Sequence, residues 1–206
     1  MLDAIPDSLL TDLKQRHAEP QRRYHDWTHI EALLGHFAAI EDRITDRIAV
    51  LHAIVFHDAV YDPKARDNEE RSAKLLMETA PAIPETSLLL AKRIIEATDG
   101  HALPDDLGGP EQQDCAYFLD MDLGILGADQ ERFDIYEDQI RFEYQHVPDE
   151  DYRKGRTQVL THFAEREHLY FTDWGQARFE KAARANLKRS IARLNPTHPD
   201  RAPPSA

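Results

Sequence analysis

The sequence predicts an all-α fold, a single bundle of about eight to ten helices. Apolar residues recur mostly at the three- and four-residue spacing of a helix, not in the alternation of a half-buried strand. Glycine is scarce, with eight residues, and no Asn-Gly or Asp-Gly pair separates two alternating runs. Because 206 residues without an internal repeat or linker suffice for one core, we expect one domain over residues 1–194. The tail over 195–206 holds four prolines and is expected to be disordered.

Capping residues and prolines set the expected helix boundaries. The first helix runs from Asp7 to about His17, and a loop over 22–25 precedes a second helix capped by Asp26 or Thr28. Thr45 is expected to cap a third helix that stops before residue 63. Further helices are expected over about 68–80, 84–98, 111–123, 128–145, 148–168 and 174–194.

The apolar run Ala49–Phe56 leads directly into the doublet His57-Asp58. The run is long for a strand and lacks alternation, so we interpret it as a buried helix. An unpaired carboxylate in such surroundings costs on the order of several kcal/mol. A metal ion is one partner that would satisfy the imidazole and the carboxylate together.

Three segments carry residue types suited to a metal site: Tyr24–Ile30, the doublet, and Phe118–Gly127. They supply a histidine, a His-Asp pair and a distant aspartate, each on or near an expected helix. This order resembles the HD-domain superfamily of metal-dependent phosphohydrolases, in particular a bacterial branch of predicted HD-superfamily phosphohydrolases without a settled substrate. Other matching stretches are 67–73, 97–101, 140–144, 155–156 and 183–187, so the resemblance covers about residues 20–190. It implies a helical bundle of the HD-domain type that holds a catalytic divalent metal.

The resemblance implies that His29, His57, Asp58 and Asp122 bind one divalent ion, which could be Mn, Mg, Fe, Co, Ni or Zn. Two imidazoles and two carboxylates leave coordination positions for water and a phosphate oxygen. Asp120 competes with Asp122 for the last position, but residues two apart on a helix face nearly opposite ways. The aspartate directly before the leucine fits the superfamily pattern, so Asp120 is expected to support a ligand or to face solvent.

Glu69 lies shortly after the doublet, where related phosphohydrolases use an acidic residue to orient the attacking water. We expect Glu69 to play that role, with Glu70 as the alternative and Asp58 as a further proton acceptor. An acid without catalytic function at a helix N-terminus would give the same pattern.

Six residues are candidates for substrate binding: His25, Lys64, Arg66, His101, Arg141 and Tyr144. The three cations could meet phosphate, although loop cations and structural salt bridges account for them as well. Arg141 and Tyr144 share a helix face, and Lys154 and Arg156 are weaker candidates. His25 and His101 could contact substrate or support a ligand. A second metal would need more ligands than these two, so a mononuclear site is favoured.

The other histidines are interpreted as surface or packing residues: His17, His36, His52, His146, His162, His168 and His198, with His52 in the core. Cys115, the single cysteine, is expected to pack inside a helix and cannot form an internal disulfide.

Composition argues against several classes of function. A net charge of −13 argues against binding of a nucleic-acid polymer. No apolar run approaches the roughly 20 residues of a membrane span, and the first residues do not resemble a signal peptide, so a cytoplasmic protein is expected. Neither a Gly-rich phosphate loop nor a Gly-x-Ser-x-Gly motif is present. A homo-oligomer is compatible with the sequence.

The first hypothesis is a hydrolase of a phosphate ester or phosphoanhydride bond in a small phosphorylated metabolite, with a nucleotide favoured. The second keeps the fold but assigns it two irons and oxidation of a substrate with oxygen, as in some HD-fold proteins. The third is a non-catalytic module that binds a nucleotide and signals to a partner.

Overall fold

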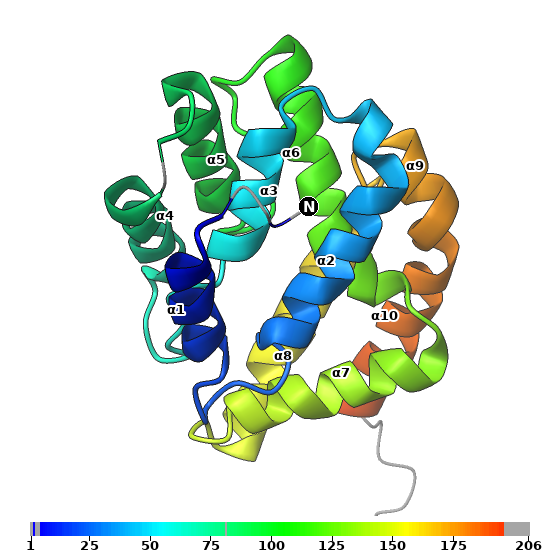
Figure 1. Ribbon diagram of the computed structural model, residues 1–206. Helices are drawn as coiled ribbons and strands as arrows, with labels where there is room; N and C mark the ends of the chain where they lie inside the picture. The colour runs from blue at the N-terminus through cyan, green and yellow to red at the C-terminus, as the bar shows by residue number, and fades with distance from the viewer. Residues whose placement is uncertain (1, 3–4, 81, 196–206) are drawn as a thin grey trace, which may run out of the picture.

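The computed structural model describes residue 2 and residues 5–80 and 82–195, and within them the regular structure is helical, without a strand. The prediction of an all-α bundle is confirmed for this part of the chain (Figure 1). The predicted disordered tail lies outside the described residues except for Asn195, and so does His198.

The α-helices, in chain order, are α1 (Asp7–His17), α2 (Trp27–Ile40), α3 (Arg47–Phe56), α4 (Asn68–Thr79), α5 (Glu85–Ala97), α6 (Gly109–Asp122), α7 (Gln130–Glu143), α8 (Asp149–Glu165), α9 (Asp173–Gly175) and α10 (Lys181–Leu194). Short 3-10 segments cover Glu41–Arg43 and Leu123–Gly127, and a π-helical turn, Gln176–Glu180, joins α9 to α10. Among the described residues, no helix is long and apolar enough to cross a membrane.

Two helix boundaries decide where the predicted ligands lie. The Asp26 carboxylate caps α2 by accepting from the Thr28 amide at 2.8 Å, as one of the two predicted alternatives requires. The predicted cap of α3 is wrong: Asp46, not Thr45, accepts from the Ala49 amide, at 2.9 Å. The Thr45 amide instead donates to the buried Asp114 carboxylate.

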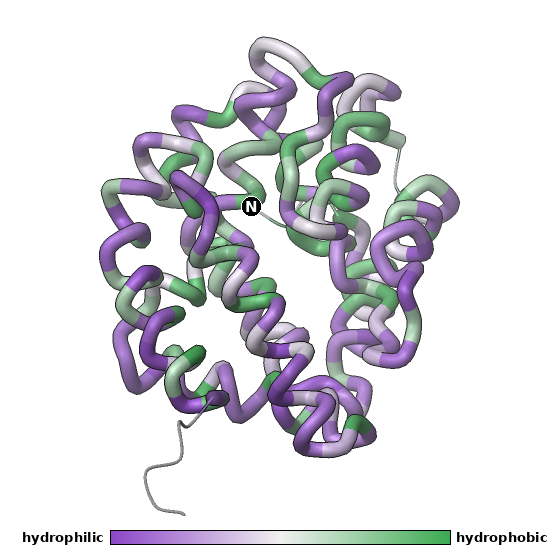
Figure 2. The backbone as a smooth tube through the Cα atoms, turned by 180° about the vertical axis from the view of Figure 1, so that it is seen from behind, coloured by the Kyte–Doolittle hydropathy of each residue, from purple (hydrophilic) through white to green (hydrophobic). Residues whose placement is uncertain are grey.

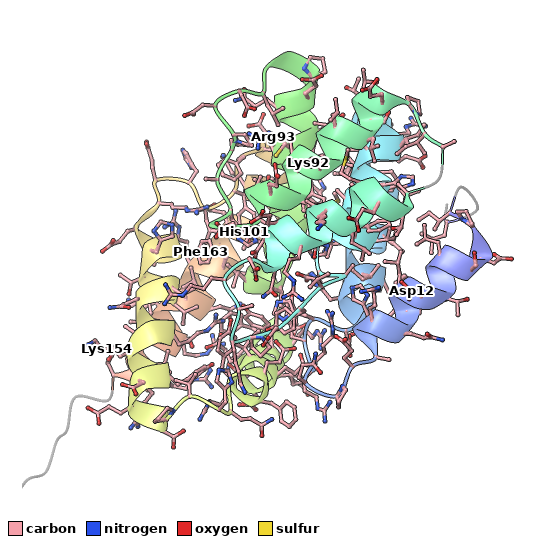
Figure 3. All side chains as sticks on the ribbon, turned by 90° about the vertical axis from the view of Figure 1, so that its left-hand side faces the viewer. Asp12, Lys92, Arg93, His101, Lys154 and Phe163 are labelled. Carbon is pink, nitrogen blue, oxygen red and sulfur yellow. The ribbon has the colours of Figure 1, made fainter. Side chains whose placement is uncertain are left out.

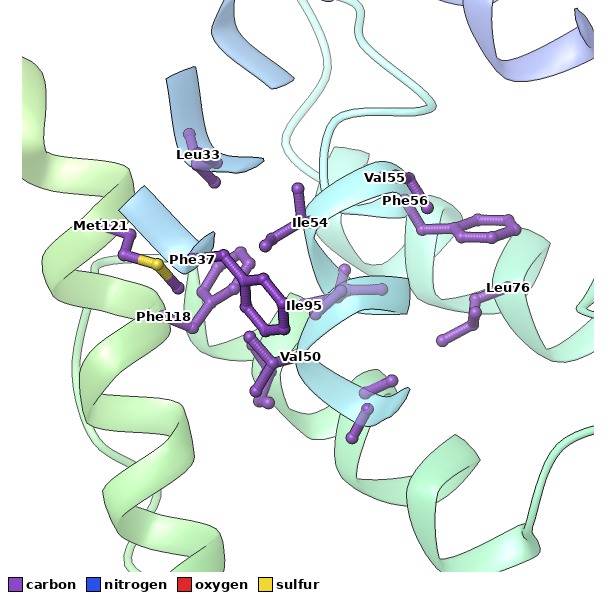
Figure 4. Close-up of a cluster of buried hydrophobic side chains, with 14 of the residues drawn as sticks. Leu33, Phe37, Val50, Ile54, Val55, Phe56, Leu76, Ile95, Phe118 and Met121 are labelled. Carbon is purple, nitrogen blue, oxygen red and sulfur yellow. The ribbon is translucent and has the colours of Figure 1, made fainter. Parts of the chain in front are cut away.

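Helix α3 is buried at every position from Ala49 to Phe56 and packs against α2, α4, α5 and α6. Figure 4 shows its side chains Val50 and Ile54 among those of α2 and α6. Full burial of such a side chain contributes about 1.5–3 kcal/mol. The helix ends at Phe56, earlier than predicted, and His57 is its C-cap. The doublet therefore lies at the helix end and not within it.

A second hydrophobic cluster is built from the 3-10 segment Leu123–Gly127 and from α7, α8 and α10. Its centre includes Phe133, Leu160 and Leu187, which are fully buried. Hydrophilic residues cover much of the outer turns of the tube in Figure 2. The chain passes from the first cluster to the second at Asp122, because Met121 belongs to one and Leu123 to the other.

Candidate metal centre

Three segments bring the predicted ligands together at the boundary between the two hydrophobic clusters. His29 comes from the first turn of α2, His57 from the end of α3 and Asp122 from the end of α6. The Nε2 atoms of the two histidines lie 3.1 Å apart, and His29 Nε2 lies 3.1 Å from Asp122 Oδ1. One ligand atom from each of the three residues lies within 4.8 Å of the other two.

The Asp58 carboxylate flanks the same pair of imidazoles. Its Oδ2 lies 3.0 Å from His57 Nε2 and 3.7 Å from His29 Nε2. Neighbouring ligands of an ion bound at about 2.1 Å are separated by roughly 3 Å in an octahedral shell. The spacing of these donors therefore suits one divalent ion.

Buried Arg22 fixes the turn that carries the doublet. Its guanidinium donates to the Asp58 carbonyl at 2.7 Å, to the Ala59 carbonyl at 3.4 Å and to the His25 carbonyl at 3.1 Å. The side chain is only 2% exposed, so these carbonyl bonds replace the water that a guanidinium would otherwise bind. Arg22 thereby ties the loop before α2 to the end of α3.

The tautomer of His57 leaves a lone pair pointing into the cluster. His57 Nδ1 lies 3.0 Å from the Ile54 carbonyl, which only accepts, so Nδ1 donates. In the neutral ring Nε2 then carries no hydrogen, yet it faces His29 Nε2 and the Asp58 and Asp122 oxygens. His57 Nε2 and the Asp58 and Asp122 oxygens are acceptors that face one another, so a proton or a metal ion must lie between them. The residues present thus fit a divalent metal.

Electrostatics around the cluster favour bound positive charge. Burial lowers the pKa of His57, but the carboxylates of Asp58 and Asp122 outweigh it and hold that pKa well above its ordinary value. Burial acts to raise the pKa of Asp58, and the imidazole of His57 more than reverses this. Burial also acts to raise the pKa of Asp122. Hydrogen bonds from histidines, led by His101, outweigh burial and hold that pKa well below its usual range. Both carboxylates therefore stay ionised.

His101 lies against the other oxygen of Asp122, with 2.9 Å between His101 Nε2 and Asp122 Oδ2. Its backbone has a φ of 50°, a left-handed conformation that a non-glycine residue adopts at a cost. Arg166 secures this loop by donating to the carbonyls of Gly100 at 2.8 Å and His101 at 2.9 Å. Asp122 is thus shared between His29 and His101.

Glu143 is the buried residue that organises the loop before α2. Its Oε1 accepts from three successive backbone amides, those of Arg23, Tyr24 and His25, at 2.7, 2.8 and 3.1 Å. Its Oε2 accepts from the Tyr61 hydroxyl at 2.7 Å and from His25 Nδ1 at 2.6 Å. His25 lies outside α2, as predicted, and its ring stacks on Tyr61. Glu143 therefore fixes the orientation of the His25 imidazole.

A cavity of about 920 Å³ opens in front of the cluster. His57, Asp58 and Asp122 line its floor, and the predicted residues Glu69, Arg66, His25, His101 and Tyr144 line its walls. Figure 3 shows His101 and Phe163 next to each other where α8 approaches α4 and α5. Burial raises the pKa of Glu69, and the carboxylates of Asp99 and Asp58 add to the effect. A Glu with a raised pKa is a stronger base, which suits the predicted role.

Other predicted substrate contacts lie elsewhere. Lys64 is exposed and does not line the cavity, and neither do Glu70 and Lys154. Arg141 lies on a separate cavity, where its guanidinium donates to the carbonyls of Tyr144 and Val147 and to Asp149. These bonds give Arg141 a structural role, which the sequence had left open as the alternative to phosphate binding.

Arg156 does line the main cavity, but it is bound to the Glu137 carboxylate and, at 2.9 Å, to the Tyr136 hydroxyl. Its guanidinium is therefore already paired. Arg156, one of the weaker candidates for phosphate binding, would have to leave Glu137 to play that role.

Asp120 does not face solvent, so that alternative is wrong. It is fully buried and accepts from the amides of Phe171 and Thr172, at 2.7 and 2.9 Å, and from the Thr172 hydroxyl. Burial raises its pKa to about 6. The predicted packing roles of His52 and Cys115 are confirmed, because both are fully buried.

Sequence reasoning missed Glu143 and Arg22. A signal for Glu143 existed: it continues the buried face of α7 through Phe133, Tyr136 and Ile140 at helical spacing. A carboxylate on such a face needs partners, and these come from the loop more than 100 residues earlier. No comparable pattern marks Arg22.

No family model, no curated protein and no solved structure matches this chain.

Proposed function

We propose that this chain is a metal-dependent phosphohydrolase of the HD-domain type, acting on a phosphate ester or anhydride of a small metabolite, with a nucleotide favoured. The supporting observation is the cluster of His29, His57, Asp58 and Asp122, whose side-chain nitrogen and oxygen atoms face one another. His57, Asp58 and Asp122 also line the 920 Å³ cavity. Their order along the chain agrees with the HD pattern, and the all-α fold agrees with it too.

His29, His57, Asp58 and Asp122 would hold the ion. A divalent ion bound there would lower the pKa of a coordinated water and polarise a phosphoryl oxygen. The hydrogen bond from His57 Nδ1 to Ile54 orients its ring, and the contact of Asp122 with His101 orients the carboxylate.

Glu69 and His25 have positions suited to proton transfer. Glu69 lines the cavity beside Asp58 and would accept the proton of the attacking water. His25 lines the same cavity and uses Nδ1 to bind Glu143, so Nε2 remains for the leaving oxygen of the substrate. Arg66 at the cavity wall would neutralise phosphate charge.

A screen of phosphate esters and nucleotides with Mn, Mg, Co, Ni and Zn tests the proposal. We expect phosphate or pyrophosphate release that requires a divalent metal and is lost in His57→Ala and Asp122→Asn. The matched control is His168→Ala, which removes an exposed histidine outside the cavity and should leave activity unchanged. Full activity in either ligand variant would exclude this site as the catalytic centre.

A second candidate, the di-iron oxygenase, draws support from Asp122. Its two oxygens face different histidines, His29 and His101, as a carboxylate shared by two ions would. Metal analysis separates the two functions. Two irons per chain and oxygen consumption without phosphate release would favour the oxygenase.

A further inference from the structure

The cavity in front of the metal centre carries more carboxylates than free cations. Its acidic lining residues are Asp58, Glu69, Asp99 and Asp122, and its guanidinium groups are those of Arg66 and Arg156. Arg156 is already paired with Glu137. In the part of the chain that the structure describes, Arg66 forms no ion pair, so of the two guanidinium groups it is the one left for substrate.

This balance limits how much negative charge the cavity can accept. A divalent ion and Arg66 together offset three of the four carboxylate charges, and a phosphate monoester then adds a charge of about −2. Each further phosphate of a di- or triphosphate would add negative charge to a cavity that Glu69 and Asp99 also line. Glu69 and Asp99 line the same cavity as Asp58 and Asp122, so an added anion there meets their negative charge.

The wall formed by α8 is suited to an uncharged organic group. Val159 is 45% exposed although it lines the cavity, and Phe163 beside it is half-buried. The rings of Tyr61 and Tyr144 also line the cavity. Flat rings of a ligand stack on aromatic side chains and pack on exposed aliphatic ones. A cavity of 920 Å³ has room for such a group beyond a single phosphate.

We infer that the substrate is a phosphate monoester with one phosphate on a ring-bearing organic group, such as a nucleoside monophosphate, and that Glu69 and Asp99 reject di- and triphosphates. The inference rests on the proposed phosphohydrolase function. The phosphate lies at the metal centre, and the ring lies against the α8 wall at Val159 and Phe163.

Turnover of the mono-, di- and triphosphates of one nucleoside tests the charge selection, with free metal held in excess over nucleotide. We expect kcat/KM for the monophosphate to exceed the others by about tenfold or more, the effect of one or two unscreened like charges. Asp99→Asn should narrow this ratio. Asp105→Asn, which removes an exposed charge outside the cavity, should not. Equal kcat/KM values across the series would overturn the inference.

Val159→Ala tests the organic subsite. It should raise KM for the nucleoside monophosphate by about three- to tenfold through lost apolar contact and leave KM for glycerol phosphate unchanged. The control Ile135→Ala shortens an equally exposed residue on α7, 44% exposed, outside the cavity. Equal effects of Val159→Ala on both substrates would contradict the placement of the ring.

Calorimetry separates failure of the inference from failure of the proposed function. If no phosphate compound is hydrolysed, the phosphohydrolase proposal fails. Binding of the same nucleotide series to the metal-loaded protein then still ranks mono- against triphosphate. Tighter binding of the triphosphate would refute the charge selection independently of turnover.

Discussion

Glu143→Gln should destabilise the chain and disable the site together, because one buried carboxylate serves both. Burial alone would raise the pKa of Glu143, but bonds from His25, the Arg23 amide and Tyr61 lower it to about 2 from 4.5. At about 1.4 kcal/mol for each pH unit, this fall corresponds to about 3 kcal/mol of stability at neutral pH. The side-chain amide of glutamine has only one acceptor oxygen. Its NH2 group is a donor and would face the His25 and Tyr61 groups, which are donors too.

Urea unfolding followed by circular dichroism measures this loss. A carboxylate with a lowered folded pKa stabilises the fold above about pH 4.5 and loses that contribution as the pH falls toward 2. The difference between wild type and Glu143→Gln should therefore be about 3 kcal/mol at pH 7 and should shrink below pH 4.5. Glu31→Gln, an exposed change on α2, is the control. A loss below about 1 kcal/mol, or one independent of pH, would show that the buried Glu143 charge does not stabilise the fold.

Three further predictions concern stability. Gly127→Ala should lower the free energy of unfolding, measured by heat or urea, by about 1–3 kcal/mol. A Cβ at position 127 would lie 2.5 Å from Phe179 Cβ and 2.8 Å from the Phe179 backbone. Gly35→Ala, open within 4 Å on α2, should instead stabilise by up to about 1 kcal/mol. Burial lowers the pKa of His17 to about 4 from 6.5. As the pH falls, His17 therefore binds a proton in the unfolded chain before it does so in the folded one. The free energy of unfolding should fall by about 3 kcal/mol between pH 6.5 and 4. His17→Leu should flatten that part of the pH profile, and an unchanged slope would disprove the cause.

The helical class was predictable because it follows from local patterns, and the resemblance to the HD-domain superfamily named the four side chains that the fold brings together. Apolar spacing indicates the helices. The buried run that ends in His57-Asp58 indicates that the imidazole and the carboxylate at its end need polar partners. The end of α3 was placed too late, since the turn after Phe56 depends on Arg22, which reaches it from 36 residues away. Propensity carries no information about such a bond.

The walls of the cavity were less predictable than its floor. Arg141 and Lys64 had suitable chemistry, but their positions in space depend on how α7, α8 and the loop after the doublet pack. Glu143 was overlooked because its partners are backbone amides, which any sequence supplies. Burial on the inner face of α7 was the usable signal.

Metal content and affinity measured on the purified chain test whether His29, His57, Asp58 and Asp122 form a divalent-metal site. After chelation and reloading with Mn, Co, Ni, Zn or Mg, mass spectrometry and titration calorimetry should find a divalent ion bound to the wild type. That ion should be lost or bound at least about tenfold more weakly in His29→Ala, His57→Ala and Asp122→Asn, with the helical circular dichroism retained. No binding of any of these ions, or binding in all three variants equal to that of the wild type, would exclude a metal site at these residues.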